Sequence, residues 1–374
     1  MALRIARWYN LPLMRNMIER ASGVMNASQG TKTVFEVVTG ERVRAPSRKR
    51  ALLAELRGVV ESDQPLSIAE QKNEEEVFSE KIMDFRLRLV GAISLYSFFS
   101  GDRYASMQDS GGLDAAYLFW YLGASQDDII DSFPKSGEND QVVSPEMIHD
   151  AIFSPDKKYL NGAHTLIQTK IEKSNMGDEQ KDYLRKKIEK WYHVVEQQES
   201  EAISSPVSVF SFAYSKRYRE GQNQTAGETV VALLNWDRCL DPKRQRLENV
   251  IPGFSFLTQM VDDILDTPED LVAKKPSYSV GALVDNPQEL EGIQSLIELK
   301  GLEYITPATL REYAPHSFAT IDTNFQAYTE TLNLMLSDMG FAGKDLVFIV
   351  KALYKYFPAV HSLMQKLPTS RKIL

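Results

Sequence analysis

The segment QDDIIDS, residues 126–132, has a counterpart in QMVDDILDTPED, residues 259–270. Each segment contains the pattern Asp-Asp-x-x-Asp, whose first and last carboxylates lie four residues apart on one face of a helix. Each pattern also follows an apolar run, at residues 117–122 and 251–261. The sequence therefore predicts two buried helices that end in carboxylates. These acids are Asp127, Asp128 and Asp131 in the first motif, and Asp262, Asp263 and Asp266 in the second.

Three acids at the end of a buried helix are unfavourable unless cations neutralise them. Oxygen ligands without a nearby histidine or cysteine suit hard divalent ions, Mg²⁺ above all, which binds one or two carboxylates together with substrate phosphates. The alternative for either motif alone is a solvated helical turn stabilised by the helix dipole. Two copies, 135 residues apart and each behind an apolar run, favour metal binding and suggest a clamp for a diphosphate.

Composition restricts the class of protein. The chain has 374 residues, of which 43% are hydrophobic, so it can bury a large core as one domain or as one domain with an added arm. Its single cysteine, Cys239, excludes a disulfide framework and a cysteine-based zinc site, and fits a reducing compartment. The net charge of −8 argues against nucleic acid as a partner. No apolar run is long enough to predict a transmembrane helix.

The N-terminal region is basic, because residues 1–60 hold 11 Lys/Arg against 4 Asp/Glu. Residues 1–25 are typical of an organelle transit peptide or of a helix in peripheral contact with a membrane, although an amphipathic helix packed on the core fits equally well. We expect the basic run Arg42–Arg50 to be a loop, and residues 61–80 to be a connector or a short helix. This divides the chain into an N-terminal arm (1–75) and a helical domain (76–374), in a cytoplasmic or organellar protein that is not secreted.

From about residue 76 onward, apolar residues recur at the three- and four-residue spacing of amphipathic helices. Prolines fall mainly between the apolar segments, with Pro252 as the exception. No alternation of period two is long enough to build a sheet. The predicted architecture is an all-α bundle, in which ligand and metal sites come from side chains on facing helices. We expect helices at residues 77–99, 114–130, 178–202, 207–220, 226–239, 245–267, 287–299 and 316–338, with a last pair within 344–365.

With two aspartate motifs on helices, the chain resembles the trans-isoprenyl diphosphate synthases of the polyprenyl synthetase family over roughly residues 76–370. Gln259 stands three residues before Asp262, as a glutamine does in the family's second motif. Lys275 is placed like the family's diphosphate-binding lysine, and Lys274 takes the place of a glycine beside it. The resemblance implies the isoprenoid synthase fold, a helical bundle with a central active-site cavity.

Three further family motifs are degraded in this chain. Residues 85–89 resemble the family's Gly-Lys-Arg-Leu-Arg-Pro motif and keep Arg86 and Arg88, but have phenylalanine in place of the lysine. Residues 135–137 read Lys-Ser-Gly instead of Arg-Arg-Gly, and residues 224–227 read Gln-Thr-Ala-Gly where the family has Lys-Thr-Gly. The nearby cations at 216, 217 and 219 are candidates to compensate, or they form a solvated basic helix face.

The resemblance gives these residues roles in binding and ionising an allylic diphosphate. Mg²⁺, with three ions per site when substrate is bound, would be held directly by Asp127, Asp131 and Asp262, while Asp128, Asp263 and Asp266 act through water or neighbouring groups. The diphosphate would be bound by Lys275 and by one of Lys216, Arg217 or Arg219. Thr225 and Gln259 would supply oxygen dipoles for the carbocation. Arg86, Arg88 and Lys135 would remain for a second diphosphate.

The nucleophile separates the functional alternatives. In a prenyl-elongating synthase, which we favour, isopentenyl diphosphate attacks the cation. In a terpene cyclase descended from such an enzyme, a double bond of the same substrate attacks, and the second basic site is dispensable. Asp262, Asp266 and Asp270 match the metal-binding triad typical of cyclases only with two substitutions. A noncatalytic partner subunit of a synthase is the third alternative, and six retained aspartates argue against it.

Product size and assembly follow from the same resemblance. The family closes its chain pocket with bulky residues one turn before the first motif, where this sequence has Leu122 and Gly123. We therefore expect a deeper pocket that ends at Phe119 and a product of twenty carbons or more, unless Phe119 simply packs the core. Synthases of this kind commonly pair through apolar helices, so a homodimer is expected.

Overall fold

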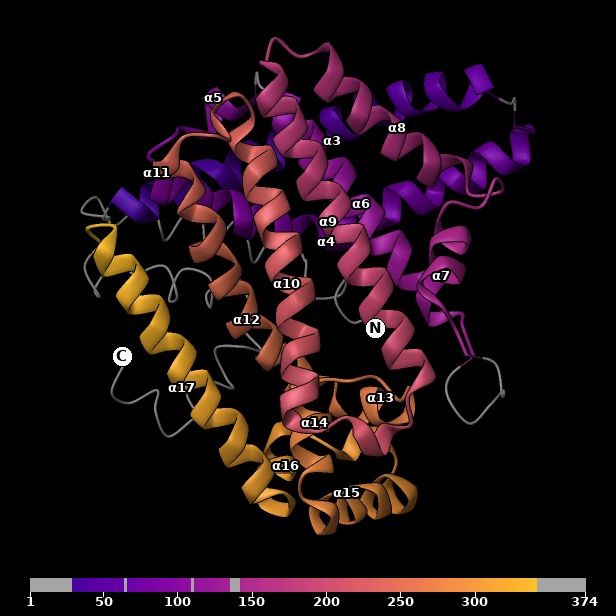
Figure 1. Ribbon diagram of the computed structural model, residues 1–374, viewed down its shortest axis with the longest axis vertical. Helices are drawn as coiled ribbons and strands as arrows, with labels where there is room; N and C mark the ends of the chain where they lie inside the picture. The colour runs from indigo at the N-terminus through magenta and orange to yellow at the C-terminus, as the bar shows by residue number, and fades with distance from the viewer. Residues whose placement is uncertain (1–28, 64–65, 109–110, 135–141, 342–374) are drawn as a thin grey trace.

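The computed structural model describes residues 29–341, apart from 64–65, 109–110 and 135–141, and shows an all-helical protein (Figure 1). Within these residues no strand occurs, which confirms the predicted all-α class. The helices, in chain order, are α3 (Gln29–Asp63), α4 (Ile68–Ser100), α5 (Tyr104–Gln108), α6 (Gly111–Asp131), α7 (Pro145–Ile152), α8 (Lys158–Lys173), α9 (Asp178–Ser204), α10 (Phe212–Asn235), α11 (Pro242–Gln245), α12 (Leu247–Leu265), α13 (Thr267–Val272), α14 (Tyr278–Val284), α15 (Pro287–Lys300), α16 (Pro307–Tyr313) and α17 (Pro315–Asp338), with 3₁₀ turns η1 (Val207–Val209), η2 (Trp236–Arg238) and η3 (Leu302–Tyr304).

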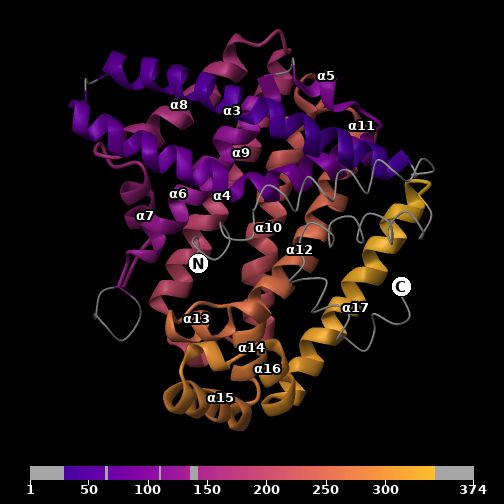
Figure 2. The ribbon, with the colours of Figure 1, turned by 180° about the vertical axis from the view of Figure 1, so that it is seen from behind.

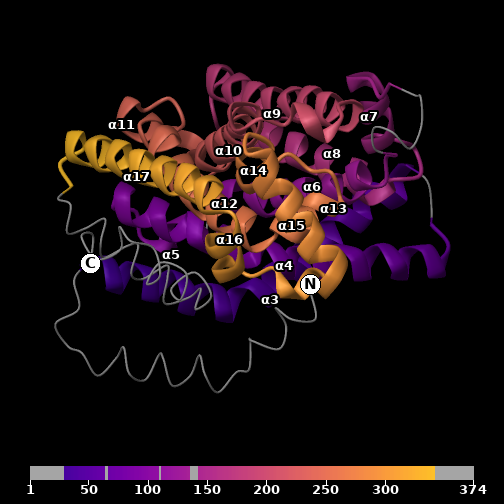
Figure 3. The ribbon, with the colours of Figure 1, turned by 90° about the horizontal axis from the view of Figure 1, so that it is seen from below.

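Helix α10 is at the centre of the bundle. It packs against α12, α9, α14, α6 and α4, and Figure 1 shows it running beside α12. The short helices α13 to α16 gather at one end of the molecule, where α17 starts (Figures 1 and 2). Seen from that end, α3 and α4 lie on one side of the molecule and α9 on the other (Figure 3).

The basic segment Arg42–Arg50 is part of α3 and not a loop, so that prediction was wrong. The inward positions of α3 recur every three or four residues, and Val37, Leu52 and Leu56 on this face are buried. Pro46 is exposed, so the backbone hydrogen bond that it removes lies on the solvent side, where water replaces it. The burial of the apolar face of α3 therefore offsets the hydrogen bond that Pro46 removes.

The region 61–80 is mostly part of two long helices, because α3 continues to Asp63 and α4 begins at Ile68. Ser67 caps α4: its hydroxyl accepts from the Glu70 amide, and the Glu70 carboxylate accepts from the Ser67 amide at 2.9 Å. The boundary that we expected at residue 75 lies inside this helix. α3 packs on α4 and α8, and its buried side chains belong to the same apolar core as those of α6 and α12.

The helices expected at 207–220 and 226–239 are one helix, α10, preceded by the turn η1. Residues 221–227, where we expected a break, are helical, and Gly227 admits a close neighbour. A Cβ atom on Gly227 would lie 2.7 Å from Cγ of Pro252, so the proline inside α12 packs directly against the glycine of α10. Helices α7 and α8 were not expected, and the predicted helices within 344–365 lie outside the described residues.

Candidate functional site

The first aspartate motif forms the C-terminal end of α6. The helix is buried as far as Ile130, but the side chains of Asp127, Asp128 and Asp131 are exposed. The expectation that this motif is buried was therefore wrong, because the helix emerges from the core within its last turn. Exposed carboxylates are accessible to a ligand from solvent.

Lys275 links the first motif to the chain that follows the second. Its Nζ atom lies 2.7 Å from each carboxylate oxygen of Asp131. Burial alone would lower the pKa of Lys275, but the negative charges of Asp127 and Asp131 outweigh it, and the pKa is raised. Lys274 adopts the left-handed conformation, with φ of 51°, which is the conformation that a glycine favours. Lys275 is thus a lysine that contacts the first motif directly.

The second motif lies at the end of α12. Asp262 is half-buried, whereas Asp263 is only 1% exposed and accepts hydrogen bonds from Gln259 Nε2 and from the Tyr278 amide, both at 2.7 Å. Asp266 ends the helix with its amide donating to the Asp262 carbonyl. Asp263 therefore stabilises the fold of residues 263–278, whereas Asp262 and Asp266 are both half-buried and more accessible than Asp263.

Arg219 is the basic residue of α10 that points at the second motif. Its guanidinium lies 3.0 Å from Asp263 Oδ1 and 3.6 Å from Asp270 Oδ2. Because one guanidinium serves two buried carboxylates, it does not offset the burial of both. Burial raises the pKa of Asp270 to about 7, although the charge of Arg219 acts in the opposite direction. The sequence could not have predicted this arrangement, since it does not show which face of α10 meets α12.

Lys216 and Arg217 have partners elsewhere. Lys216 donates to Asn324 Oδ1 at 3.1 Å and lies over the ring of Tyr328, both on α17. Arg217 lies over the ring of Tyr214. Successive residues of a helix point about 100° apart, so Arg219 and its two basic neighbours cannot all face the same site.

Lys81, on α4, is a cation at the first motif that the sequence analysis missed. Its Nζ atom lies 2.6 Å from Asp128 Oδ2, and its side chain is 18% exposed. Lys81 lies four residues after the start of the helix that we expected at residue 77. Helices α4 and α6 pack together, and only this packing shows that Lys81 approaches the aspartates.

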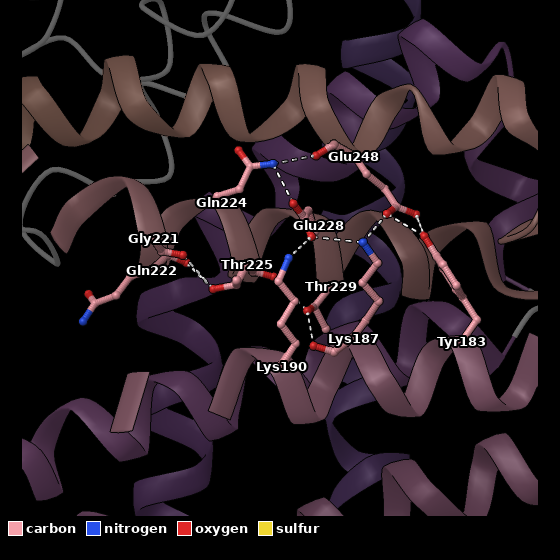
Figure 4. Close-up of polar contacts among 10 residues, drawn as sticks. All are labelled: Tyr183, Lys187, Lys190, Gly221, Gln222, Gln224, Thr225, Glu228, Thr229 and Glu248. Atoms are coloured by element: carbon pink, nitrogen blue, oxygen red, sulfur yellow. Dashed lines mark hydrogen bonds and ion pairs between the residues drawn. The ribbon is translucent and has the colours of Figure 1, made fainter. Parts of the chain in front are cut away.

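The polar side chains of residues 224–229 stabilise helix packing (Figure 4). The Thr225 hydroxyl is buried and donates to the Gly221 carbonyl of its own helix at 2.8 Å. Gln224 donates to Glu228, whose carboxylate also pairs with Lys187 and Lys190 on α9. Lys187 also pairs with Glu248 of α12 at 2.7 Å, so this cluster of opposite charges joins α9, α10 and α12.

Phe119 packs against Trp191 of α9, with ring centroids 4.5 Å apart, and is 2% exposed. The same indole fills the space beside Gly123, where a Cβ atom would lie 3.5 Å from its Cζ2 atom. Gly123 precedes Asp127 by four residues and shares its helix face. The bulky group nearest to the first motif on this face is therefore Trp191, which the sequence could not place there.

Three predicted diphosphate-binding residues, Arg86, Arg88 and Lys135, have side chains that lie outside the described residues. Two hollows in the described part of the protein, of about 1100 Å³ between α3 and α8 and about 500 Å³ between α10, α12 and α17, have none of the six aspartates in their lining. The central active-site cavity stays a prediction. Among the described residues, no helix is both long and apolar enough to cross a membrane.

The carboxylates of the two motifs could supply some, but not all, of the ligands of a Mg²⁺ ion. No three His, Cys, Asp or Glu side chains of the described residues are grouped closely enough to hold a metal ion by themselves. Mg²⁺ commonly uses one or two carboxylates and completes its octahedron with water and substrate phosphates. The accessible carboxylates of Asp127, Asp131 and Asp262 fit this mode, with a bound diphosphate supplying the remaining oxygens.

No family model, no curated protein and no solved structure gives a significant match to the chain.

Proposed function

We propose that the protein is a Mg²⁺-dependent prenyltransferase that joins an allylic diphosphate to isopentenyl diphosphate and forms a trans-prenyl diphosphate of twenty carbons or more. The observation that carries the proposal is the contact of Lys275 with both oxygens of Asp131, at 2.7 Å. This contact brings the chain that follows the second motif against the first motif. It supports one shared site between the two aspartate-bearing helices, in an isoprenoid synthase bundle with a central cavity.

Each residue then has a defined task. Asp127, Asp131 and Asp262 would hold Mg²⁺, which as a Lewis acid neutralises the leaving diphosphate. Lys275 exchanges its contact with Asp131 for contacts with diphosphate oxygens, so that the site holds a cation before and after binding. Arg219 holds Asp263 and Asp270, and so positions α12, which carries the second motif, and α13, which precedes Lys275 in the chain.

A terpene cyclase is the second candidate, and the orientation of two cations favours it. Lys216 and Arg217 are turned toward Asn324, Tyr328 and Tyr214, so neither compensates for the degraded second diphosphate site. A cyclase needs only one diphosphate site. Elongation requires that Arg86, Arg88 and Lys135 bind the second diphosphate without help from these two residues.

Product analysis separates the candidates. Purified protein is incubated with Mg²⁺ and dimethylallyl, geranyl, farnesyl or geranylgeranyl diphosphate, each with and without labelled isopentenyl diphosphate, and products are identified by mass spectrometry. We expect a longer diphosphate ester that forms only with isopentenyl diphosphate. A hydrocarbon or alcohol from one allylic diphosphate alone would identify a cyclase. Absence of product in every mixture would contradict both and favour a noncatalytic partner subunit.

A further inference from the structure

Gln126 is a buried amide without a protein partner. Its side chain is 2% exposed, and within the described structure neither its Oε1 nor its Nε2 atom has a hydrogen-bond partner. An unsatisfied buried polar group destabilises a protein, and such groups are uncommon in native structures. An apolar side chain of similar size would avoid this penalty. A ligand that forms a polar contact with the Gln126 amide would remove this penalty.

The position of Gln126 identifies where that ligand would lie. Gln126 directly precedes Asp127, the first acid of the exposed motif, but its side chain is inside the protein. Leu122 and Phe119 precede it by four and seven residues, so the three buried side chains lie on one face of α6. Phe119 contacts Trp191 at the inner end of this face. A ligand with its charged end at the aspartates and its apolar end toward Phe119 would pass Gln126 between the two.

The two residues expected to supply dipoles to such a ligand are already engaged. The Thr225 hydroxyl donates to the carbonyl of Gly221, within its own helix. The Gln259 amide donates to the buried carboxylate of Asp263 at 2.7 Å. If Thr225 turned toward a ligand, the Gly221 carbonyl would lose this hydrogen bond. If Gln259 did so, the Asp263 carboxylate of the second motif would lose one. Gln126 can turn its carbonyl oxygen toward a ligand without breaking a hydrogen bond of this kind.

We infer that Gln126 is a catalytic residue that directs its amide oxygen at the carbon that becomes positively charged when the bond to the diphosphate breaks. In that step the carbon–oxygen bond electrons leave with the diphosphate, and the positive charge spreads over the allylic carbons. The amide forms no bond and transfers no proton; its dipole stabilises the charge in a site of low polarity. This inference rests on the proposed function.

The test compares two ligands in calorimetric titrations of the full chain. The first is inorganic diphosphate with Mg²⁺. The second is a prenyl amine whose protonated nitrogen takes the place of the charged carbon. It is added together with diphosphate and Mg²⁺. Replacing Gln126 by leucine should weaken binding of the prenyl ammonium about tenfold or more, because a hydrogen bond or dipole acting on a charged group is that strong. Binding of diphosphate alone should change by less than about threefold, since the aspartates and Lys275 are intact.

Stability gives a matched control. Gln126→Leu should unfold at the same or a higher temperature than wild type, because it removes an unsatisfied group. Gln222→Leu should unfold at a lower temperature, because Gln222 Nε2 donates to Glu199 Oε1 at 2.6 Å. If Gln126→Leu does not fold, the unbranched Gln126→Met is measured instead. If Gln126→Leu lost the same affinity for both ligands, or lost none for either, the role of Gln126 would be overturned and the proposed function would stand. Failure of the wild type to bind diphosphate with Mg²⁺ would overturn the proposed function together with it.

Discussion

At the scale of single residues, the contact between Lys275 and Asp131 defines the candidate site. Replacing Lys275 by methionine should lower the affinity for diphosphate with Mg²⁺ and the turnover by about tenfold or more, because charge-assisted hydrogen bonds to the ligand are lost. The free energy of unfolding should change by about 1 kcal/mol or less, since the ion pair is partly exposed. Calorimetry and chemical denaturation measure the two effects.

Lys274 provides the control for this change. Lys274→Gly should stabilise the protein by up to about 1 kcal/mol, because glycine adopts the positive φ of this position without strain. It should leave diphosphate affinity unchanged, since Lys275 remains. If Lys274→Gly weakened binding as much as Lys275→Met, the assignment of Lys275 as the inward lysine would be wrong.

Asp270 should make stability depend on pH in a predictable direction. The pKa of its buried carboxyl is about 7, against 3.8 for an ordinary aspartate, so between these values the folded protein keeps a proton that the unfolded chain releases. The contribution of Asp270 to the free energy of unfolding is therefore largest below pH 3.8, falls as the pH rises to about 7, and is constant above.

Urea denaturation of wild type and Asp270→Asn across this range measures that contribution. The stability of wild type relative to the variant should decrease as the pH rises, and should level off above about pH 7. A difference that stays constant, or that grows with pH, would show that Arg219 keeps Asp270 ionised when folded.

Spacing in the sequence identified the acids of both motifs but not the direction of the cations. From the sequence alone, three cations of α10 were equal candidates for the site: Lys216, Arg217 and Arg219. Only the packing of α10 on α12 distinguishes them. Gln126 could not be recognised either, because an unsatisfied amide is a property of its surroundings and not of its position in a motif.

At the scale of helices, the contact of α10 with α12 depends on a glycine. Gly227→Ala should destabilise the protein by about 1–3 kcal/mol, because the added Cβ atom would lie 2.7 Å from Pro252 and the helices would have to separate. Gly292→Ala, inside α15 with no atom within 4 Å of the new Cβ, should stabilise it by about 0.5–1 kcal/mol through helix propensity. Thermal unfolding that gave the same sign for both would contradict this packing.

Trp191 of α9 should limit product length. Its indole lies beside Gly123 and Phe119, on the face of α6 that leads inward from Asp127. Trp191→Leu should therefore extend the product by at least one isoprenoid unit, as measured by mass spectrometry, and Phe119→Ala should act in the same direction. Trp236→Leu is the control, because Trp236 is also buried but lies in η2; it should lower stability and leave the product unchanged.

Several helix boundaries were predictable from apolar periodicity. Helices α6, α9, α15 and α17 lie close to their expected ranges, whereas α3 was missed and α4 begins at Ile68 and not at residue 77. The sequence Ser67-Ile-Ala-Glu70 is a capping box and could have identified the start of α4. Pro46 suggested a loop in α3, because the sequence does not show that this proline faces solvent.

At the scale of the whole molecule, the fold class was predictable because the apolar pattern has a helical period throughout the described chain. A shared site for the two motifs was expected from their repeated pattern and from resemblance, since they are 135 residues apart and no local contact relates them. Helix α10 packs on both α6 and α12, and Lys275, which follows the second motif, contacts Asp131 of the first. The central claim is therefore that Asp127 and Asp262 belong to one site.

Binding of inorganic diphosphate in the presence of Mg²⁺, measured by calorimetry for wild type, Asp127→Ala and Asp262→Ala, tests this claim most directly. In a single shared site, each substitution alone should abolish most of the Mg²⁺-dependent affinity, while the unfolding temperature stays near that of wild type because Asp127 is exposed and Asp262 half-buried. If each variant kept the affinity of wild type, the two motifs would not form one diphosphate site.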